Sequence, residues 1–163
     1  MGINSNTRKK EVILYTDGAC SGNPGVGGWG LVLMFKDSTG TVHKREESGA
    51  EGSTTNNRME ISAVIHGLNL LKTPCSVTVY SDSSYVCNAI MQGWLDSWQK
   101  NGWKNSKKEA VKNPDLWQEY LALSSIHDIK FVHVKGHADN EYNNRCDTLA
   151  TMAVKEWKKN NRA

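Results

Sequence analysis

Two aspartates of this sequence occupy positions from which they could hold divalent cations. Asp17 and Asp82 each follow a largely apolar run that is typical of a buried strand, and each precedes a small residue. A carboxylate at the carboxyl end of such a strand points into the crevice where open α/β sheets bind ligands. Asp82 alone is explained equally well as a helix cap or turn residue, because a helix is expected to follow it. Two such aspartates on separate strands favour a site.

Two further acids lie early in predicted helices. Glu60 shares a stripe with Val64 and Leu68 at helical spacing, so its carboxylate should face the sheet, where desolvation is costly unless it meets a cation. A capping box between Asn57 and Glu60 is the alternative, since it would use the same acid locally. Asp147 lies early in the last predicted helix, and an interaction with the helix dipole is the alternative there.

Four acids gathered at one end of a sheet would repel one another strongly in a partly desolvated site. Magnesium or manganese would compensate this charge, because hard divalent ions bind carboxylate oxygens and keep water and substrate oxygens as further ligands. Two ions about 4 Å apart can bind a phosphate, activate water and stabilise the leaving oxygen. The acids therefore indicate metal-assisted phosphodiester hydrolysis. His137, in a loop of small residues, is placed where it could reach the same crevice, although a loop histidine is usually only solvated.

A basic segment with interleaved tryptophans suits a polyanionic partner. Between Trp94 and Asn113, five lysines and two acids give 5 − 2 = +3, which equals the net charge of the whole chain. Trp94 and Trp98 are one helical turn apart, and core packing is the common role of such a pair. The lysines around them favour an exposed nucleic-acid-binding handle, residues 94–112. A second basic run, from Lys155 to Arg162, is interpreted as a solvated helix end.

Other patterns exclude several kinds of site. The run from Gly25 to Gly30 has the spacing G-x-G-x-x-G, but it leads into a strand and not into a helix, so a dinucleotide site is not expected. Its glycines should instead allow a tight hairpin and close approach of the backbone to a large group. The pair His133 and His137 lacks a third ligand for zinc. No C-x-x-C pair, signal peptide or membrane-length apolar run occurs, which favours a soluble intracellular protein with reduced thiols.

The expected elements form one α/β domain, for which 163 residues are long enough. Three strands in succession are followed by strands alternating with helices, which predicts one mixed sheet with helices packed on its faces. The predicted strands are 12–16, 28–35, 41–48, 77–81 and 129–134. The predicted helices are 57–71, 84–92, 94–101, 114–125 and 143–158.

Seven blocks, in order along residues 11–158, resemble bacterial-type ribonuclease H of type one. They are Tyr15-Thr16-Asp17-Gly18-Ala19-Cys20, Gly22-Asn23-Pro24-Gly25, Thr55-Asn56-Asn57-Arg58-Met59-Glu60, Ser81-Asp82-Ser83, Gly102-Trp103-Lys104, Val134-Lys135-Gly136-His137 and Asn144-Arg145-Cys146-Asp147. The resemblance implies the ribonuclease H-like fold, a five-stranded mixed sheet of three antiparallel and two parallel strands with helices on both faces. It also implies an endonuclease that cleaves the RNA strand of RNA–DNA hybrids without marked sequence specificity, leaving 5′-phosphate and 3′-hydroxyl ends.

The resemblance also implies roles for individual residues. Asp17, Glu60, Asp82 and Asp147 match the carboxylates that bind two Mg²⁺, with Mn²⁺ as a substitute, and His137 matches a histidine that assists proton transfer or product release. The substrate-binding matches are Cys20, Asn23, Asn56 and Asn57 for the minor groove or RNA strand, Thr55 and Asn113 for a DNA phosphate, Tyr85, Trp94 and Trp98 for a channel beside the DNA strand, and Lys104, Lys107 and Lys108 for a basic protrusion. Ser84 is also matched to a substrate-binding position, although it stands where many bacterial members carry glutamine, and Gly93 is an extra residue before the handle.

The remaining expectations concern the organisation of the chain and its alternatives. Residues 1–10 are expected to be a flexible polar N-terminus, 11–158 the catalytic domain and 159–163 a polar tail. A cytoplasmic monomer that does not bind membranes is expected. A hybrid- or duplex-RNA-binding module without catalysis is one alternative, and a different nuclease or integrase on the same fold is another, because a fold does not determine its substrate.

Overall fold

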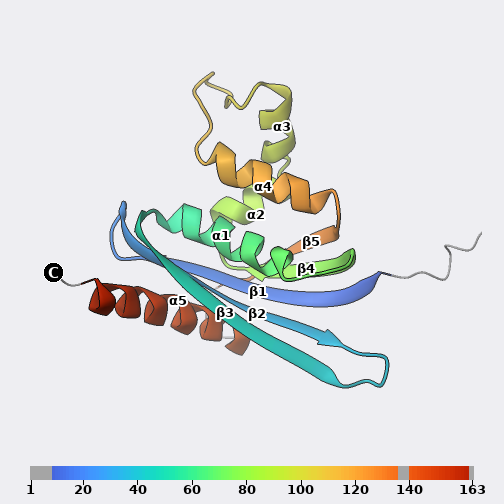
Figure 1. Ribbon diagram of the computed structural model, residues 1–163. Helices are drawn as coiled ribbons and strands as arrows, with labels where there is room; N and C mark the ends of the chain where they lie inside the picture. The colour runs from blue at the N-terminus through green and yellow to red at the C-terminus, as the bar shows by residue number, and fades with distance from the viewer. Residues whose placement is uncertain (1–8, 136–139, 162–163) are drawn as a thin grey trace, which may run out of the picture.

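A five-stranded mixed sheet forms the centre of the molecule in the computed structural model, which describes residues 9–135 and 140–161 (Figure 1). The strand order is β3-β2-β1-β4-β5. An antiparallel meander is made by β1 (Lys10–Cys20), β2 (Gly25–Lys36) and β3 (Val42–Thr54), and β4 (Cys75–Ser81) and β5 (Asp128–His133) run parallel to β1. The sheet predicted from the sequence is confirmed.

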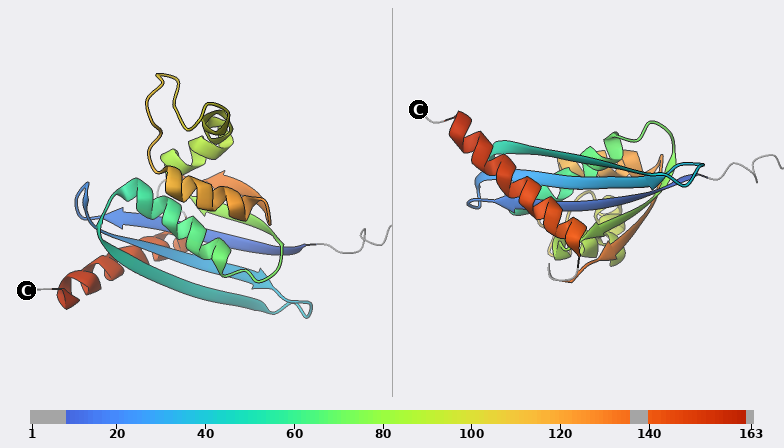
Figure 2. Two further views of the ribbon diagram at one scale, coloured as in Figure 1. Left: turned by 45° about the horizontal axis from the view of Figure 1, so that its top comes forward. Right: turned by 90° about the horizontal axis from the view of Figure 1, so that it is seen from below.

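Helices cover both faces of this sheet, as predicted. One face carries α1 (Asn56–Asn69), α2 (Ser84–Met91), α3 (Trp94–Lys100) and α4 (Pro114–Ser124), with α3 furthest from the strands. The long helix α5 (Glu141–Asn160) crosses the opposite face beneath β1, β2 and β3 (Figure 2).

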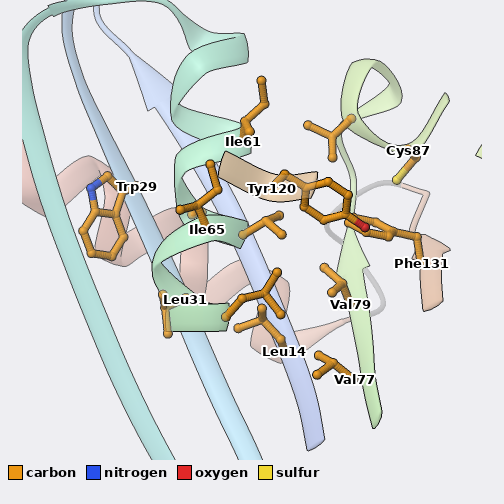
Figure 3. Close-up of a cluster of buried hydrophobic side chains, with 14 of the residues drawn as sticks. Leu14, Trp29, Leu31, Ile61, Ile65, Val77, Val79, Cys87, Tyr120 and Phe131 are labelled. Atoms are coloured by element: carbon orange, nitrogen blue, oxygen red, sulfur yellow. The ribbon is translucent and has the colours of Figure 1, made fainter. Parts of the chain in front are cut away.

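The main core fills the space between the sheet and α1. Alternate side chains of the strands, among them Leu14, Leu31 and Val79, point at Ile61 and Ile65 of α1 (Figure 3). All of these side chains are buried. Because burial of apolar surface is the dominant favourable contribution to folding, this contact rigidly fixes α1 on the strands that end at the acidic residues.

Two element boundaries differ from the sequence prediction in ways that affect the acids. β1 continues to Cys20 because it remains paired with β2, whereas its parallel pairing with β4 stops at Tyr15 and Tyr80. Asp17 therefore lies within a strand, just past the point where β1 and β4 separate. α5 begins at Glu141 and not at Asn143, because the side chain of Asn140 accepts hydrogen bonds from the first turn.

The glycines of β2 allow α5 to lie directly on the backbone of the sheet. A Cβ atom on Gly28 would overlap the carbonyl oxygen of Ala150, and one on Gly30 would overlap that of Cys146. The G-x-G-x-x-G run thus leads into β2, as expected, and the large group that approaches it closely is α5.

Residues 9–135 and 140–161 contain no helix that is both long and apolar enough to span a membrane. The four cysteines, which all lie in these ranges, are unpaired, and three of them are buried.

The contact between β2 and α5 predicts that Gly30→Ala destabilises the protein by about 1–3 kcal/mol, the usual cost of overpacking. The added methyl would also lie 2.8 Å from Leu149 Cβ, so the helix has to move away from the sheet. Urea unfolding measures the change. Gly40→Ala is the control, because a methyl there meets nothing within 4 Å and reports only the strain of a positive φ, about 1 kcal/mol. An unfolding midpoint of Gly30→Ala equal to that of the wild type would contradict the packing argument.

Candidate active site

Three carboxylates from three different elements converge at one end of the sheet. One carboxylate oxygen each from Asp17 on β1, Glu60 on α1 and Asp82 after β4 lie within 4.8 Å of one another. They line an open cavity of about 430 Å³. Asp147 of α5 lines the same cavity but is not part of this close group. The structure therefore brings together all four acids that the sequence singled out, three of them within the spacing of metal ligands.

Local backbone structure aims the two aspartates. Asp17 lies where β1 leaves β4, and the Gly18 N–H donates to its Oδ1 at 2.9 Å. Asp82 follows β4 directly, but the residue that caps α2 is Ser83, whose Oγ accepts from the Val86 N–H at 3.2 Å. The explanation of Asp82 as a helix cap is therefore wrong, and Asp82 is one of the residues that line the cavity.

The burial of Glu60 follows from how α1 begins and from what it rests on. The N-cap of α1 is Thr55, which accepts from the Arg58 N–H, so the capping box between Asn57 and Glu60 is not formed. Glu60 faces the sheet with 5% of its surface exposed. Gly18 permits this approach, because a Cβ there would lie 2.6 Å from the Glu60 nitrogen.

Burial and mutual repulsion disfavour the charged forms of Asp17 and Glu60 in the absence of a cation. Burial, followed by the nearby charge of Asp82, raises the pKa of the Asp17 carboxyl to about 8. Burial and the charges of Asp17 and Asp82 also raise the pKa of Glu60 well above its usual value. Glu60 Oε1 is buried and has no hydrogen-bond partner among the described residues. An orphaned carboxylate oxygen among all-oxygen donors fits a hard divalent ion such as Mg²⁺ or Mn²⁺.

Of the two remaining residues predicted for the site, the structure describes Asp147 but not His137. Asp147 is half-buried in the second turn of α5, and its charge adds to the raised pKa of Asp17. Because helix-dipole effects fall off within the first turn, the dipole explanation of Asp147 is weak at this position. His137 falls outside the described residues, so its position relative to the acids is a prediction only.

Polar residues predicted to contact the RNA strand form the wall beside the acids. Asn56 and Asn57 lie in the first turn of α1 and line the cavity. The Asn56 N–H donates to Asn23 Oδ1 at 3.4 Å, which links the β1–β2 loop to this helix. The Cys20 thiol donates to the carbonyl oxygens of Gly22 and Thr54, so it supports the same loop.

A second group joins the starts of α1, α2 and α4. Asn113 has a φ of 60°, and its side chain donates to the Tyr85 hydroxyl at 3.2 Å and accepts from Arg58 at 3.1 Å. Arg58 also forms two hydrogen bonds with Asp115, at 2.8 and 3.1 Å. Thr55 and Asn113, predicted to hold one phosphate, are thus bridged by Arg58. Arg58 was named from the sequence only as part of a motif and was given no role, because no local pattern shows that its side chain reaches α4.

The tryptophans of the handle are both packed and exposed. Trp98 packs against the core and lies 6.2 Å, centroid to centroid, from the buried Trp117. Trp94 is 42% exposed, and with Trp98 and Lys104 it lines a cavity of about 530 Å³. Gly93, the N-cap residue of α3, has a φ of 77°, a conformation that favours glycine. The handle therefore presents an aromatic surface next to its exposed lysines, which are Lys104, Lys107 and Lys108.

The remaining predicted contact is Ser84. It is exposed in the first turn of α2, lines the acidic cavity and lies next to Tyr85. A serine hydroxyl reaches less far from the backbone than the glutamine that many bacterial members carry at this position.

Comparisons with known proteins agree with this architecture. The family model described as RNase H matches residues 9–155. A ribonuclease H of Acetivibrio thermocellus is 57% identical over 147 residues, covering 90% of this chain and 97% of the relative. A ribonuclease H of Chlorobium chlorochromatii is 57% identical over 148 residues, covering 91% and 98%.

Solved structures show the same arrangement of strands and helices. The crystal structure of LC9-RNase H1, a type 1 RNase H with the type 2 active-site motif, has a TM-score of 0.79 and 28% identity, covering 92% of this chain and 81% of that one. The structure of LC11-RNase H1 in complex with RNA/DNA hybrid has a TM-score of 0.62 and 29% identity, covering 90% and 98%. The fold predicted from the resemblance is confirmed.

The raised pKa values predict that Asp17→Asn stabilises the metal-free protein at neutral pH. Folding raises the pKa of Asp17 from 3.8 to about 8, so the folded state keeps a proton that the unfolded state has lost, and stability falls as the pH rises through this window. An uncharged Asn side chain at position 17 removes this loss of stability with rising pH. In chelator, its free energy of unfolding should exceed the wild type's at pH 8 by more than about 1.4 kcal/mol, the equivalent of one pKa unit.

Urea unfolding at several pH values measures this difference, which should shrink toward pH 4. The control is Asp96→Asn, at an exposed position of α3, which should show no such growth with pH. A difference that is flat with pH, or of opposite sign, would contradict the raised pKa of Asp17.

Proposed function

Because the chain belongs to the ribonuclease H family, we propose that it hydrolyses the RNA strand of RNA–DNA hybrids by metal-dependent phosphodiester cleavage. The observation that carries this proposal is the close group of Asp17, Glu60 and Asp82 at the base of an open cavity. A structural relative was solved with an RNA/DNA hybrid, which supports the substrate class. Cleavage within the strand should leave 5′-phosphate and 3′-hydroxyl ends.

The acidic residues act by holding cations at the scissile phosphate. Asp17, Glu60 and Asp82 would hold Mg²⁺, or Mn²⁺ as a substitute, and Asp147, which lines the same cavity, would add a further carboxylate. When bound, such ions neutralise the phosphate and lower the pKa of an attacking water. The carboxyls of Asp17 and Glu60 have raised pKa values in the metal-free protein, so they retain protons to higher pH. Because metal binding displaces these protons, the affinity for metal should rise with pH. His137 is proposed to assist proton transfer or product release.

Discrimination between the two strands is assigned to the two polar groups beside the acids. Short side chains at Asn23, Asn56 and Asn57, close to the cavity, suit contacts with 2′-hydroxyls across a wide, shallow minor groove. The site bridged by Arg58, between Thr55 and Asn113, suits a phosphate of the DNA strand. Contacts with 2′-hydroxyls and phosphates carry no information about the bases, so cleavage should depend little on sequence.

We base the domain bounds, the location and the oligomeric state on the same family. We assign catalysis to residues 11–158, with residues 1–10 and 159–163 as polar ends. The cytoplasm as location and a monomer as the working form are part of the proposal. No membrane partner is part of the proposal.

The function predicts that a hybrid with labelled RNA is cut when Mg²⁺ is titrated in, while the matching DNA duplex is not. Asp82→Asn should lower kcat by about 10²–10³-fold, the usual loss when charge stabilisation in the transition state is removed. Gel analysis of product ends checks the 5′-phosphate and 3′-hydroxyl chemistry. Asp96→Asn, an exposed acid of the handle, is the matched control and should keep wild-type kcat.

Two other results would replace this function. Tight hybrid binding by the intact protein without cleavage at any Mg²⁺ or Mn²⁺ concentration would indicate a non-catalytic binding module. Equal cleavage of double-stranded DNA would indicate a different nuclease on the same fold. Wild-type cleavage by Asp82→Asn would refute the assignment of the metal ligands.

The handle predicts a change in the salt dependence of binding. Replacing Lys104, Lys107 and Lys108 by Gln should weaken hybrid affinity and reduce the slope of log K against log salt by about 1 per lysine, because fewer counterions are released. Single-turnover cleavage at saturation should change little. Fluorescence anisotropy at several salt concentrations measures the slope.

A control variant removes the same charge elsewhere. Lys155, Lys158 and Lys159 are exposed on the last turns of α5. Their replacement by Gln should leave the slope nearly unchanged. Equal slopes for the two triple variants would show that the handle contacts no phosphates and that only net charge matters.

A further inference from the structure

A buried amide joins the three main-chain segments that carry Asp17, Asp82 and Asp147. Asn143, the third residue of α5, has 1% of its surface exposed. Its Nδ2 donates to the carbonyl oxygen of Tyr80 at 3.2 Å and to that of Thr16 at 3.4 Å. A single side chain thus links α5 to β1 and to β4.

These two carbonyl groups lie where the parallel pairing of β1 with β4 ends. The last registered pair between β1 and β4 is Tyr15 with Tyr80, and beyond it the two strands separate to enclose the cavity. Thr16 immediately precedes Asp17, and Tyr80 is two residues before Asp82. The amide therefore bridges the two strands where the pairing of β1 with β4 ends.

The third connection runs along α5. Asn143 and Asp147 are four residues apart, about one helical turn, so they project from the same side of the helix. Anchoring Asn143 to the strand ends fixes the height and rotation of this first turn. The same contact therefore sets where Asp147 lies relative to Asp17 and Asp82.

The amide of Asn143 satisfies the geometry with a neutral side chain. Both partners are carbonyl oxygens, so the group that faces them must supply two N–H donors, which Asp and Leu lack. An asparagine at this position lowers stability in one respect, because its Oδ1 atom is buried and has no hydrogen-bond partner among the described residues. An apolar side chain would pack at this position without burying an unpaired oxygen, so the two hydrogen bonds, and not packing, account for the asparagine.

We propose that Asn143 is a positioning residue that sets the spacing of Asp17, Asp82 and Asp147 and thereby the affinity of the cluster for divalent cations. The inference rests on the proposed metal-dependent function. Groups that orient metal ligands from behind typically change metal affinity or activity by about 10–100-fold when they are removed. Asn143 is not among the described residues that line the cavity, so the role proposed for it is to hold the segments that carry the acids.

Binding of Mn²⁺ to the metal-free protein, measured by the electron paramagnetic resonance signal of the free ion, tests the proposal without catalysis. Asn143→Ala should weaken Mn²⁺ binding by about tenfold or more. In hybrid cleavage it should lower kcat and raise the Mg²⁺ concentration for half-maximal rate, with KM for the hybrid unchanged. Asn143→Ser, which keeps one donor, should lie between Asn143→Ala and the wild type in both assays.

Val154→Ala is the control for a purely structural effect. Val154 is also buried on α5 and packs near Gly28 of β2, eleven residues from Asn143. This variant should lose stability in urea but keep wild-type Mn²⁺ affinity and kcat. If Asn143→Ala behaves in the same way, the proposal is refuted. If Asn143→Ala does not fold, wild-type Mn²⁺ affinity in Asn143→Ser refutes it instead.

The outcome is separable from that of the proposed function. A wild-type protein that binds Mn²⁺ but cleaves no hybrid would refute the proposed function, and a tenfold loss of Mn²⁺ affinity in Asn143→Ala would still support positioning. Hybrid cleavage by the wild type together with unchanged Mn²⁺ affinity in Asn143→Ala would refute the positioning role alone.

Discussion

Repulsion between buried carboxylates is the constraint on which this structure depends. Asp17, Glu60 and Asp82 place oxygens within 4.8 Å of one another, and burial makes the charged forms of Asp17 and Glu60 costly. Nothing in the local sequence favours that arrangement, so it persists only because the surrounding fold holds each carrier segment firmly. The stability that is lost at this cluster is the physical basis of its affinity for cations, since an ion that neutralises the group recovers it.

The fold meets this constraint with close contacts on both faces of the sheet. Gly18 lets α1 bring Glu60 against β1, and Gly28 and Gly30 let α5 rest on the backbone of β2. Apolar burial between α1 and the strands supplies the main stabilisation on one face. Asn143 adds a polar contact where apolar packing cannot act, because main-chain carbonyl groups at the strand ends require donors.

The same arrangement separates chemistry from recognition. Asp17, Glu60 and Asp147 lie on strand or helix and Asp82 directly follows β4, so their positions are determined by elements packed in the core. The residues proposed to contact nucleic acid lie on a loop, on helix starts and on the handle, which projects away from the strands (Figure 1). Contacts that depend on charge and shape tolerate such placement better than metal coordination does, because phosphate attraction acts over several ångströms and carboxylate coordination does not.

The sequence by itself determined the periodicities that predict the mixed sheet and its helices, the four acids and the basic handle, since these depend on residue types and short spacings. The capping of α1 by Thr55, the extent of β1 past Asp17 and the start of α5 at Glu141 were decided by contacts with neighbouring elements. The bridge from Arg58 to Asn113 and the amide of Asn143 between β1 and β4 join residues 55 to 127 positions apart. Only the tertiary structure decides such contacts, because their energy depends on where two distant segments meet and no local pattern records that.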